Sequence, residues 1–128
     1  MLKNGTIVGN STTDCLQLAN TDTSTIDHVT FSGCAGGIAI GANSKVTNST
    51  FNLPSGAGAG INCTGSACLV ENNVINAPNG SFLVFFHDST SLYGENVIDA
   101  GSGGSFITGG GTSLGNNVCT SGGTTNKC

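Results

Sequence analysis

The chain has 128 residues, enough for one domain with a modest core, and only 8% of them are charged. Its net charge of −4 includes three lysines and no arginine, so the basic patch that nucleic acids or anionic membranes require is absent. No apolar run approaches the roughly 20 residues that span a bilayer, and the first residues lack the apolar core of a secretory signal. We expect no nucleic-acid partner and no membrane span.

Six short sequence motifs, which we call words, share one pattern and recur every 20–24 residues along the chain. Each starts and ends with an apolar or aromatic residue and has polar residues, often Asn, between. In chain order they are LKNGTI (2–7), IDHVTF (26–31), VTNSTF (46–51), VENNVI (70–75), YGENVI (93–98) and LGNNVC (114–119). Because a fixed internal period is typical of solenoids, the pattern predicts one structural coil per repeat.

A second set of apolar words falls between the first. These words are CLQL (15–18), GIAI (37–40), GINC (60–63), FLVFF (82–86) and FIT (106–108). Short apolar runs bounded by Gly, Asn, Ser and Thr are typical of strands and turns, and 21 glycines disfavour helices. The sequence therefore predicts an all-β parallel solenoid of about 5–6 coils, each of 20–24 residues.

Aligning the words predicts columns of like residues stacked from coil to coil. One inward column holds Ile7, Phe31, Phe51, Ile75, Ile98 and Cys119, and another holds Leu16, Ile38, Ile61, Leu83 and Ile107. A structural ladder holds Asn4, His28, Asn48, Asn72, Glu95 and Asn116, and its neighbouring column holds Asn73, Asn96 and Asn117. Asn tolerates left-handed backbone angles, so we expect these amides to satisfy a buried turn, with the His28 imidazole replacing an amide.

The coil length, the apolar stacks and the Asn-containing words VTNSTF, VENNVI, YGENVI and LGNNVC resemble the right-handed, single-stranded parallel β-helix of the pectate-lyase-like superfamily. The resemblance implies that ENN is the turn between the second and third sheets. It also implies that GIAI, GINC and FLVFF belong to the first sheet, whose outer face often lines the ligand groove. The residues expected to bind a ligand are Gln17, Asn62, His87 and Tyr93.

The predicted domain covers residues 1–128, with an irregular tail over 119–128 that is fixed by Cys128. Enzymes of the family usually have more coils, and no cap precedes the first coil. Uncovered β-helix ends invite pairing with other chains. We therefore expect either a fragment of a longer chain or an oligomer that buries its ends.

Six cysteines fit a disulfide framework formed in an oxidising compartment. Of the 15 pairings that six cysteines allow, we favour Cys63–Cys68 and Cys119–Cys128, which close short loops, and therefore Cys15–Cys34. The alternative is that some cysteines are buried small apolar residues. A zinc site is not expected, because no CxxC occurs and the histidines lie far from cysteine pairs in sequence.

Candidate catalytic residues are few. A lyase of this family uses a basic side chain, often Arg, beside calcium, whereas this chain has no Arg. A glycoside hydrolase needs two carboxylates on one face, and the candidates are Asp88, Glu95, Asp99 and His87, near Tyr93. The alternative for these residues is a solvated turn with several polar groups.

No resident metal or other cofactor is expected from the sequence. Calcium binding by Asp14, Asp22 or Asp27 is the open alternative, because carboxylate oxygens are its preferred ligands.

These observations favour a non-catalytic module that binds a polysaccharide or cell-surface glycan, as in a phage tailspike, a fibre or an adhesin. Such a module is expected outside the cell, on a cell surface or on a virion, and a tailspike is expected to be a homotrimer. The first alternative is a fragment of a polysaccharide hydrolase or lyase. The second is a structural solenoid that self-assembles through its ends.

Overall fold

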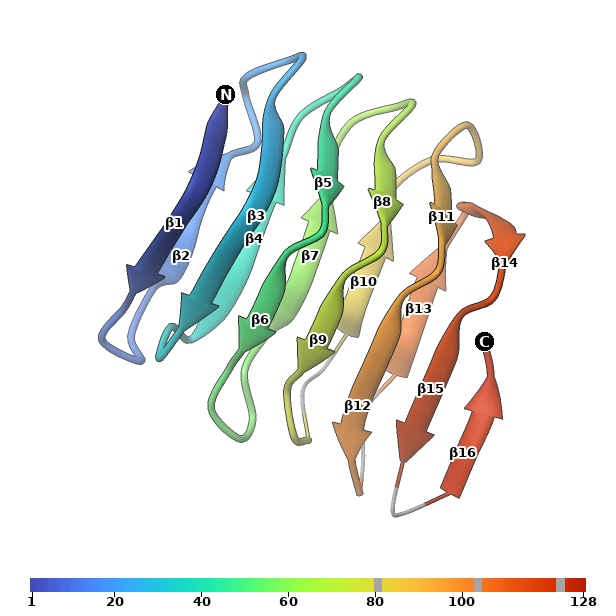
Figure 1. Cartoon of the computed structure of the whole chain (residues 1–128). Coiled ribbons are helices and arrows are strands. Elements are labelled where there is room, and N and C mark those ends of the chain that lie inside the picture. Colours follow the sequence, from blue (N-terminus) through green and yellow to red (C-terminus); the bar gives the residue numbers. More distant parts are fainter. Residues whose placement is uncertain (80–81, 103–104, 122–123) are drawn as a thin grey trace.

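The computed structural model describes residues 1–79, 82–102, 105–121 and 124–128, and these residues form strands and no helix. The chain winds into a β-solenoid of about five turns. In each turn it runs down a front sheet and returns up a back sheet, one step further to the right (Figure 1). This winding is right-handed, as the resemblance to the β-helix family implies. The described ranges contain no segment that meets the helix length and apolarity needed to cross a membrane.

Residues at both ends of each six-residue word form strands of the front sheet. Its eleven strands are β1 (Leu2–Val8), β3 (Thr25–Ser32), β5 (Lys45–Thr47), β6 (Thr50–Asn52), β8 (Leu69–Glu71), β9 (Val74–Asn76), β11 (Leu92–Gly94), β12 (Val97–Gly101), β14 (Thr112–Gly115), β15 (Val118–Ser121) and β16 (Thr124–Lys127). Except for the pair β15–β16, neighbouring strands are parallel. The front strand is continuous in the first two turns and is divided into two short strands in each later turn.

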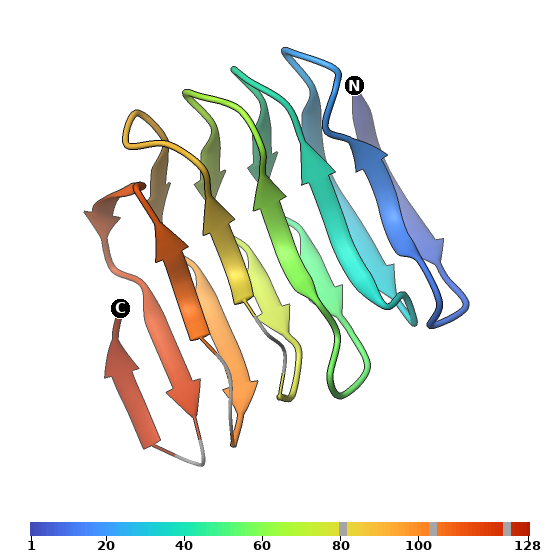
Figure 2. The same cartoon turned by 180° about the vertical axis from the view of Figure 1, so that it is seen from behind.

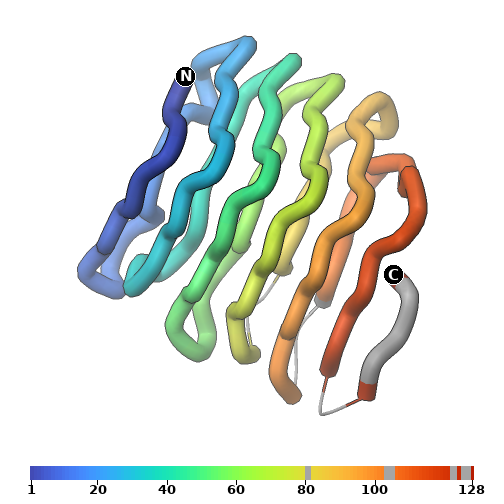
Figure 3. The backbone as a smooth tube through the Cα atoms, viewed as in Figure 1, coloured from blue at the N-terminus to red at the C-terminus, as the bar shows by residue number. Residues whose placement is uncertain are grey.

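The back sheet faces the viewer in Figure 2. Its five parallel strands are β2 (Asp14–Leu18), β4 (Gly36–Ile40), β7 (Ala59–Cys63), β10 (Phe82–Phe86) and β13 (Ser105–Gly109). They coincide with the second set of apolar words. Successive turns stack in chain order, as the tube in Figure 3 shows, so the core is a column enclosed between the two sheets.

The front half of the core is the column that the sequence predicts. Strand pairing places Ile7, Phe31, Phe51, Ile75, Ile98 and Cys119 in one register. The rings of Phe31 and Phe51 stack with centroids 4.8 Å apart. Each residue is therefore covered by a similar residue in the next turn, which removes apolar surface from water at about 25 cal/mol per Å².

The predicted back column is wrong at one position. Val84, and not Leu83, pairs with Ile61 and Ile107. Leu83 and Val84 are both fully buried. The strict alternation of buried and exposed residues is therefore interrupted in β10, and the apolar word FLVFF could not indicate which residue occupies the column.

The ladder residues share one backbone conformation. Their φ angles lie between 51° and 57°, in the left-handed region, and the residues are Asn4, His28, Asn48, Asn72, Glu95 and Asn116. All six are exposed. Asn is enriched in this conformation because its short polar side chain tolerates it, which explains the repeated Asn in the words.

The buried amide ladder lies one residue further along the chain than we expected. Asn73, Asn96 and Asn117 are at most 3% exposed. The Asn96 Oδ1 accepts hydrogen bonds from the Asn73 backbone N–H and Nδ2 at 3.0 and 3.1 Å, and the Asn117 Oδ1 accepts the same pair from Asn96 at 3.1 Å each. Ser49 continues the ladder, donating its N–H to the Asn73 Oδ1 at 2.9 Å. The left-handed residue turns its own side chain to solvent, and the next residue points inward.

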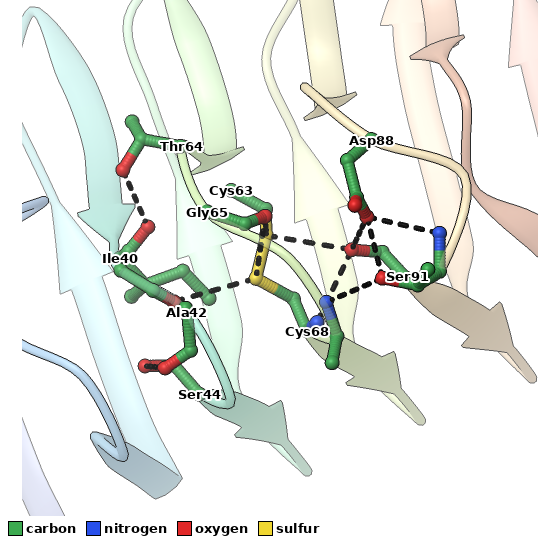
Figure 4. Close-up of a disulfide and its surroundings, with 12 residues drawn as sticks. Ile40, Ala42, Ser44, Cys63, Thr64, Gly65, Cys68, Asp88 and Ser91 are labelled. Carbon is green, nitrogen blue, oxygen red and sulfur yellow. Dashed lines mark hydrogen bonds between the residues drawn. A yellow bond between two sulfur atoms is a disulfide. The ribbon is translucent and has the colours of Figure 1, made fainter.

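All six cysteines are paired as the loop lengths suggest. The disulfides are Cys15–Cys34, Cys63–Cys68 and Cys119–Cys128. Cys63–Cys68 closes the loop that follows β7, and this loop lies beside the next turn of the solenoid (Figure 4). Three disulfides are compatible with an extracellular protein.

We expected an irregular C-terminal segment over 119–128, but this segment contains strand structure. β16 pairs antiparallel with β15, from Val118 opposite Lys127 to Ser121 opposite Thr124. The Cys119–Cys128 disulfide links the two strands. The Thr- and Gly-rich composition of this segment suggested a loop, but an adjacent strand edge supplies hydrogen-bond partners that composition does not reveal.

Candidate functional site

Three aromatic side chains form a ridge on the outer surface of the back sheet. They are Phe82, Phe85 and His87, which we call the aromatic ridge. The ring centroids of Phe82 and Phe85 are 5.6 Å apart, and those of Phe85 and His87 are 4.6 Å apart. Phe82 is 42% exposed, Phe85 is half-buried and His87 is exposed. Three neighbouring rings on one outer surface are notable on a chain with so few aromatic residues.

The alternation that resumes after the buried pair Leu83 and Val84 explains why Phe85 and His87 face outward. Phe86 is buried and stacks on Tyr93 in the core, with ring centroids 5.5 Å apart. Because successive strand side chains point to opposite faces, Phe85 points to solvent. Sequence reasoning treated FLVFF as one apolar strand and missed Phe82 and Phe85. Phe85 and His87 are two residues apart, and the alternation of side chains along a strand places such residues on the same face. This spacing was the signal that could have indicated the ridge.

Asn62, a predicted ligand-binding residue, lies beside the ridge. Strand pairing places it opposite Phe85 on one side and Ala39 on the other. Its Oδ1 is enclosed and has no hydrogen-bond partner among the described residues. An enclosed polar atom without a partner costs about 1–3 kcal/mol.

Gln17, another predicted ligand-binding residue, lies in the same column as Asn62 and Phe85 but two turns before Asn62. It is exposed, and its Nε2 donates a hydrogen bond to the Asp14 Oδ2. The column thus presents amide groups on the early turns and aromatic rings on a later one. Gln17 lies on the same face as the ridge without touching it.

Tyr93 does not belong to this surface, so its prediction as a ligand-binding residue is not supported by its position. Strand pairing places Tyr93 opposite Val70, which is fully buried. The Tyr93 ring packs against the core and stacks on Phe86. Tyr93 therefore points inward from the front sheet.

Asp88 occupies the turn that follows the ridge, near the Cys63–Cys68 disulfide (Figure 4). Its Oδ1 accepts hydrogen bonds from the Thr90 Oγ1 at 2.7 Å and the Thr90 backbone N–H at 2.9 Å. The hydrogen bond from the Thr90 hydroxyl is the main cause of the lowered pKa of Asp88. A general acid requires the opposite shift, so the environment of Asp88 suits a turn-stabilising carboxylate.

The other candidate carboxylates lie on the front sheet. Glu95 is exposed in the left-handed turn between β11 and β12. Asp99 is exposed in β12, and its Oδ1 accepts a hydrogen bond from the Gly101 N–H at 2.9 Å. No hydrogen bond or ion pair in the described part of the chain joins Glu95 or Asp99 to Asp88 or His87. The fold thus distributes these candidates over both sheets.

A second polar cluster surrounds Asp27 on the front sheet. The Asp27 Oδ1 lies 2.8 Å from the Asn48 Nδ2, 3.1 Å from the Thr47 Oγ1 and 2.9 Å from the His28 Nδ1. Its Oδ2 lies 3.2 Å from the Lys3 Nζ. These donors, Asn48 first, hold the pKa of Asp27 well below its usual range. The cluster joins the first three turns.

The calcium candidates are separate from one another. Asp14 accepts a hydrogen bond from Gln17, Asp22 accepts one from the Ala42 N–H, and Asp27 is occupied by the cluster above. Among the residues with described positions, no three His, Cys, Asp or Glu side chains lie close enough to hold a metal ion.

The first turn also contains an apolar cavity of about 380 Å³. It is lined by Leu2, Ile7, Leu16, Leu18 and Ile26, with Met1 and several hydroxyl side chains at its margin. These residues continue the core column into the first turn, so the cavity is the end of the core.

Comparisons with protein-family models, with curated proteins and with solved structures found no match to the chain.

Proposed function

We propose that this protein is a non-catalytic extracellular module that binds carbohydrate through the aromatic ridge and Asn62. The exposed ridge carries the proposal. Aromatic rings pack against the apolar faces of sugar rings, and an adjacent amide can hydrogen-bond to sugar hydroxyls. The three disulfides support a location outside the cell.

The distribution of the carboxylates supports a binding role over a catalytic one. Retaining and inverting glycosidases hold two carboxylates about 5–10 Å apart, on either side of the bond that is cleaved. Here Asp88 is committed to its turn, and Glu95 and Asp99 lie on the front sheet. The candidates thus offer no acid–base pair beside the ridge.

We also propose that the chain is related to the pectate-lyase-like β-helices and serves as part of a phage tailspike, fibre or adhesin. The solenoid architecture and the turn asparagines support this relationship. In a tailspike the module would be a homotrimer, which the mass of the protein in solution tests.

The function is tested by incubating the protein with a panel of soluble bacterial and plant polysaccharides. Affinity gel electrophoresis measures binding, and assays for reducing and unsaturated ends measure cleavage. We expect retardation in at least one gel without new chain ends. New ends produced by the wild type and abolished in Asp88→Asn or Glu95→Gln would contradict the proposal and support an enzyme.

A further inference from the structure

The charge around the ridge is informative about the kind of glycan that can bind. All three lysines lie away from the back sheet: Lys3 is in β1, Lys45 in β5 and Lys127 in β16. The charged groups on the back sheet and at its edge include Asp14 in β2 and Asp88 directly after His87. A uronate chain on the ridge would therefore lie beside the Asp88 carboxylate, whereas the strands that carry the lysines belong to the front sheet.

The relative tilt of the rings is equally informative. The planes of Phe82 and Phe85 are inclined by 40°, and those of Phe85 and His87 by 82°. Rings that lie flat on a crystalline polysaccharide must be coplanar. Because Phe85 and His87 are in edge-to-face contact, they offer no such flat platform, whereas a single soluble chain can adapt its conformation to tilted rings.

The surroundings of the ridge leave it open on both sides. In the neighbouring turns the residues in register with the ridge are small: Ala59 opposite Phe82, and Asn62 and Thr108 on either side of Phe85. The ridge consequently stands above its neighbours in the turns before and after it. Such a surface can bind sugar units in the middle of a polysaccharide chain as well as at its end.

We infer that the aromatic ridge selects single chains of uncharged polysaccharide over uronate chains and over crystalline surfaces. This inference rests on the proposed carbohydrate-binding function and specifies its ligand class. The rings supply the apolar contact, the Asn62 amide supplies hydrogen bonds, and the Asp88 carboxylate next to His87 repels acidic chains.

The test compares three kinds of probe at pH 8, where histidine is normally uncharged. The neutral soluble probes are hydroxyethylcellulose, galactomannan and dextran, the acidic probes are polygalacturonate and alginate, and the crystalline probe is microcrystalline cellulose. We expect binding to at least one neutral soluble probe, with Phe85→Ala weakening it about tenfold. Val97→Ala on the exposed front sheet is the matched control, and thermal melting verifies that both variants fold.

A gain of binding provides an independent readout. Thr108 is half-buried and lies in register with Phe85, so Thr108→Lys would place one positive charge beside the ridge. We expect this variant to acquire binding to polygalacturonate that weakens as salt is added, since the new contact is electrostatic.

The outcomes separate the inference from the proposed function. Wild-type protein that binds acidic or crystalline probes as well as neutral ones overturns the inference and leaves carbohydrate binding intact. Equal polygalacturonate binding by wild type and Thr108→Lys also contradicts the inference. Binding to none of the probes contradicts both.

Discussion

The buried amide ladder provides the sharpest test of how the turns are held together. Asn96 is fully buried, and its Oδ1 accepts hydrogen bonds from the Asn73 backbone N–H and Nδ2. Its Nδ2 donates to the Val70 carbonyl at 3.0 Å. Asn96→Leu keeps the approximate size of the side chain but removes all of these bonds. The Asn73 N–H and the Val70 carbonyl then lose a buried partner.

Each buried polar group left unsatisfied costs about 1–3 kcal/mol, so we expect Asn96→Leu to lower the free energy of unfolding by about 3 kcal/mol. Urea unfolding followed by circular dichroism, with the disulfides intact, measures this change. Asn76→Leu makes the same substitution at an exposed position of β9 and should change stability by no more than about 0.5 kcal/mol. Equal unfolding midpoints for the two variants would refute the reasoning.

Three further predictions follow from the fold. Asn72 has a φ of 56°, so Asn72→Val should destabilise by about 1–2 kcal/mol while Asn72→Gly should be close to neutral in thermal melts. The pKa of Asp27 is lower in the folded protein than its unfolded value of about 3.9, so ionised Asp27 stabilises the fold at pH values above about 4. The wild type should therefore melt at a higher temperature than Asp27→Asn at pH 7, and this difference should shrink as the pH falls below about 4. An undiminished difference at pH 2 would argue against the Asp27 cluster. Replacing Cys15 and Cys34 together by Ser should lower the unfolding free energy by about 3 kcal/mol, and equal midpoints in urea would contradict a stabilising role for this disulfide.

The architecture was predictable because each repeat is one structural unit. The period of the words determines the length of a turn, and like residues such as Phe31 and Phe51 must then coincide. The left-handed conformation of the ladder column followed from the preference of Asn. These inferences need only local chemistry and a constant period.

The site was harder to predict because it depends on which face a side chain takes. In FLVFF every residue is apolar, so the pattern does not distinguish the outward Phe85 from the inward Phe86. Tyr93 was expected to bind a ligand, but its column is occupied by buried Val70 in the preceding turn. Similarly, the buried amides are those of Asn73 and its partners, because the residue before each one turns its own side chain outward.

The central claim, that the aromatic ridge binds glycan, is tested most directly by comparing Phe85→Ala with Val97→Ala in affinity gels that contain the best-bound polysaccharide. Both substitutions remove an outward-facing apolar side chain from a strand, one on the ridge and one on the front sheet. We expect Phe85→Ala to migrate nearly as in a gel without polysaccharide and Val97→Ala to be retarded like the wild type. Equal retardation of the two folded variants would contradict the claim and place any glycan-binding surface elsewhere on the solenoid.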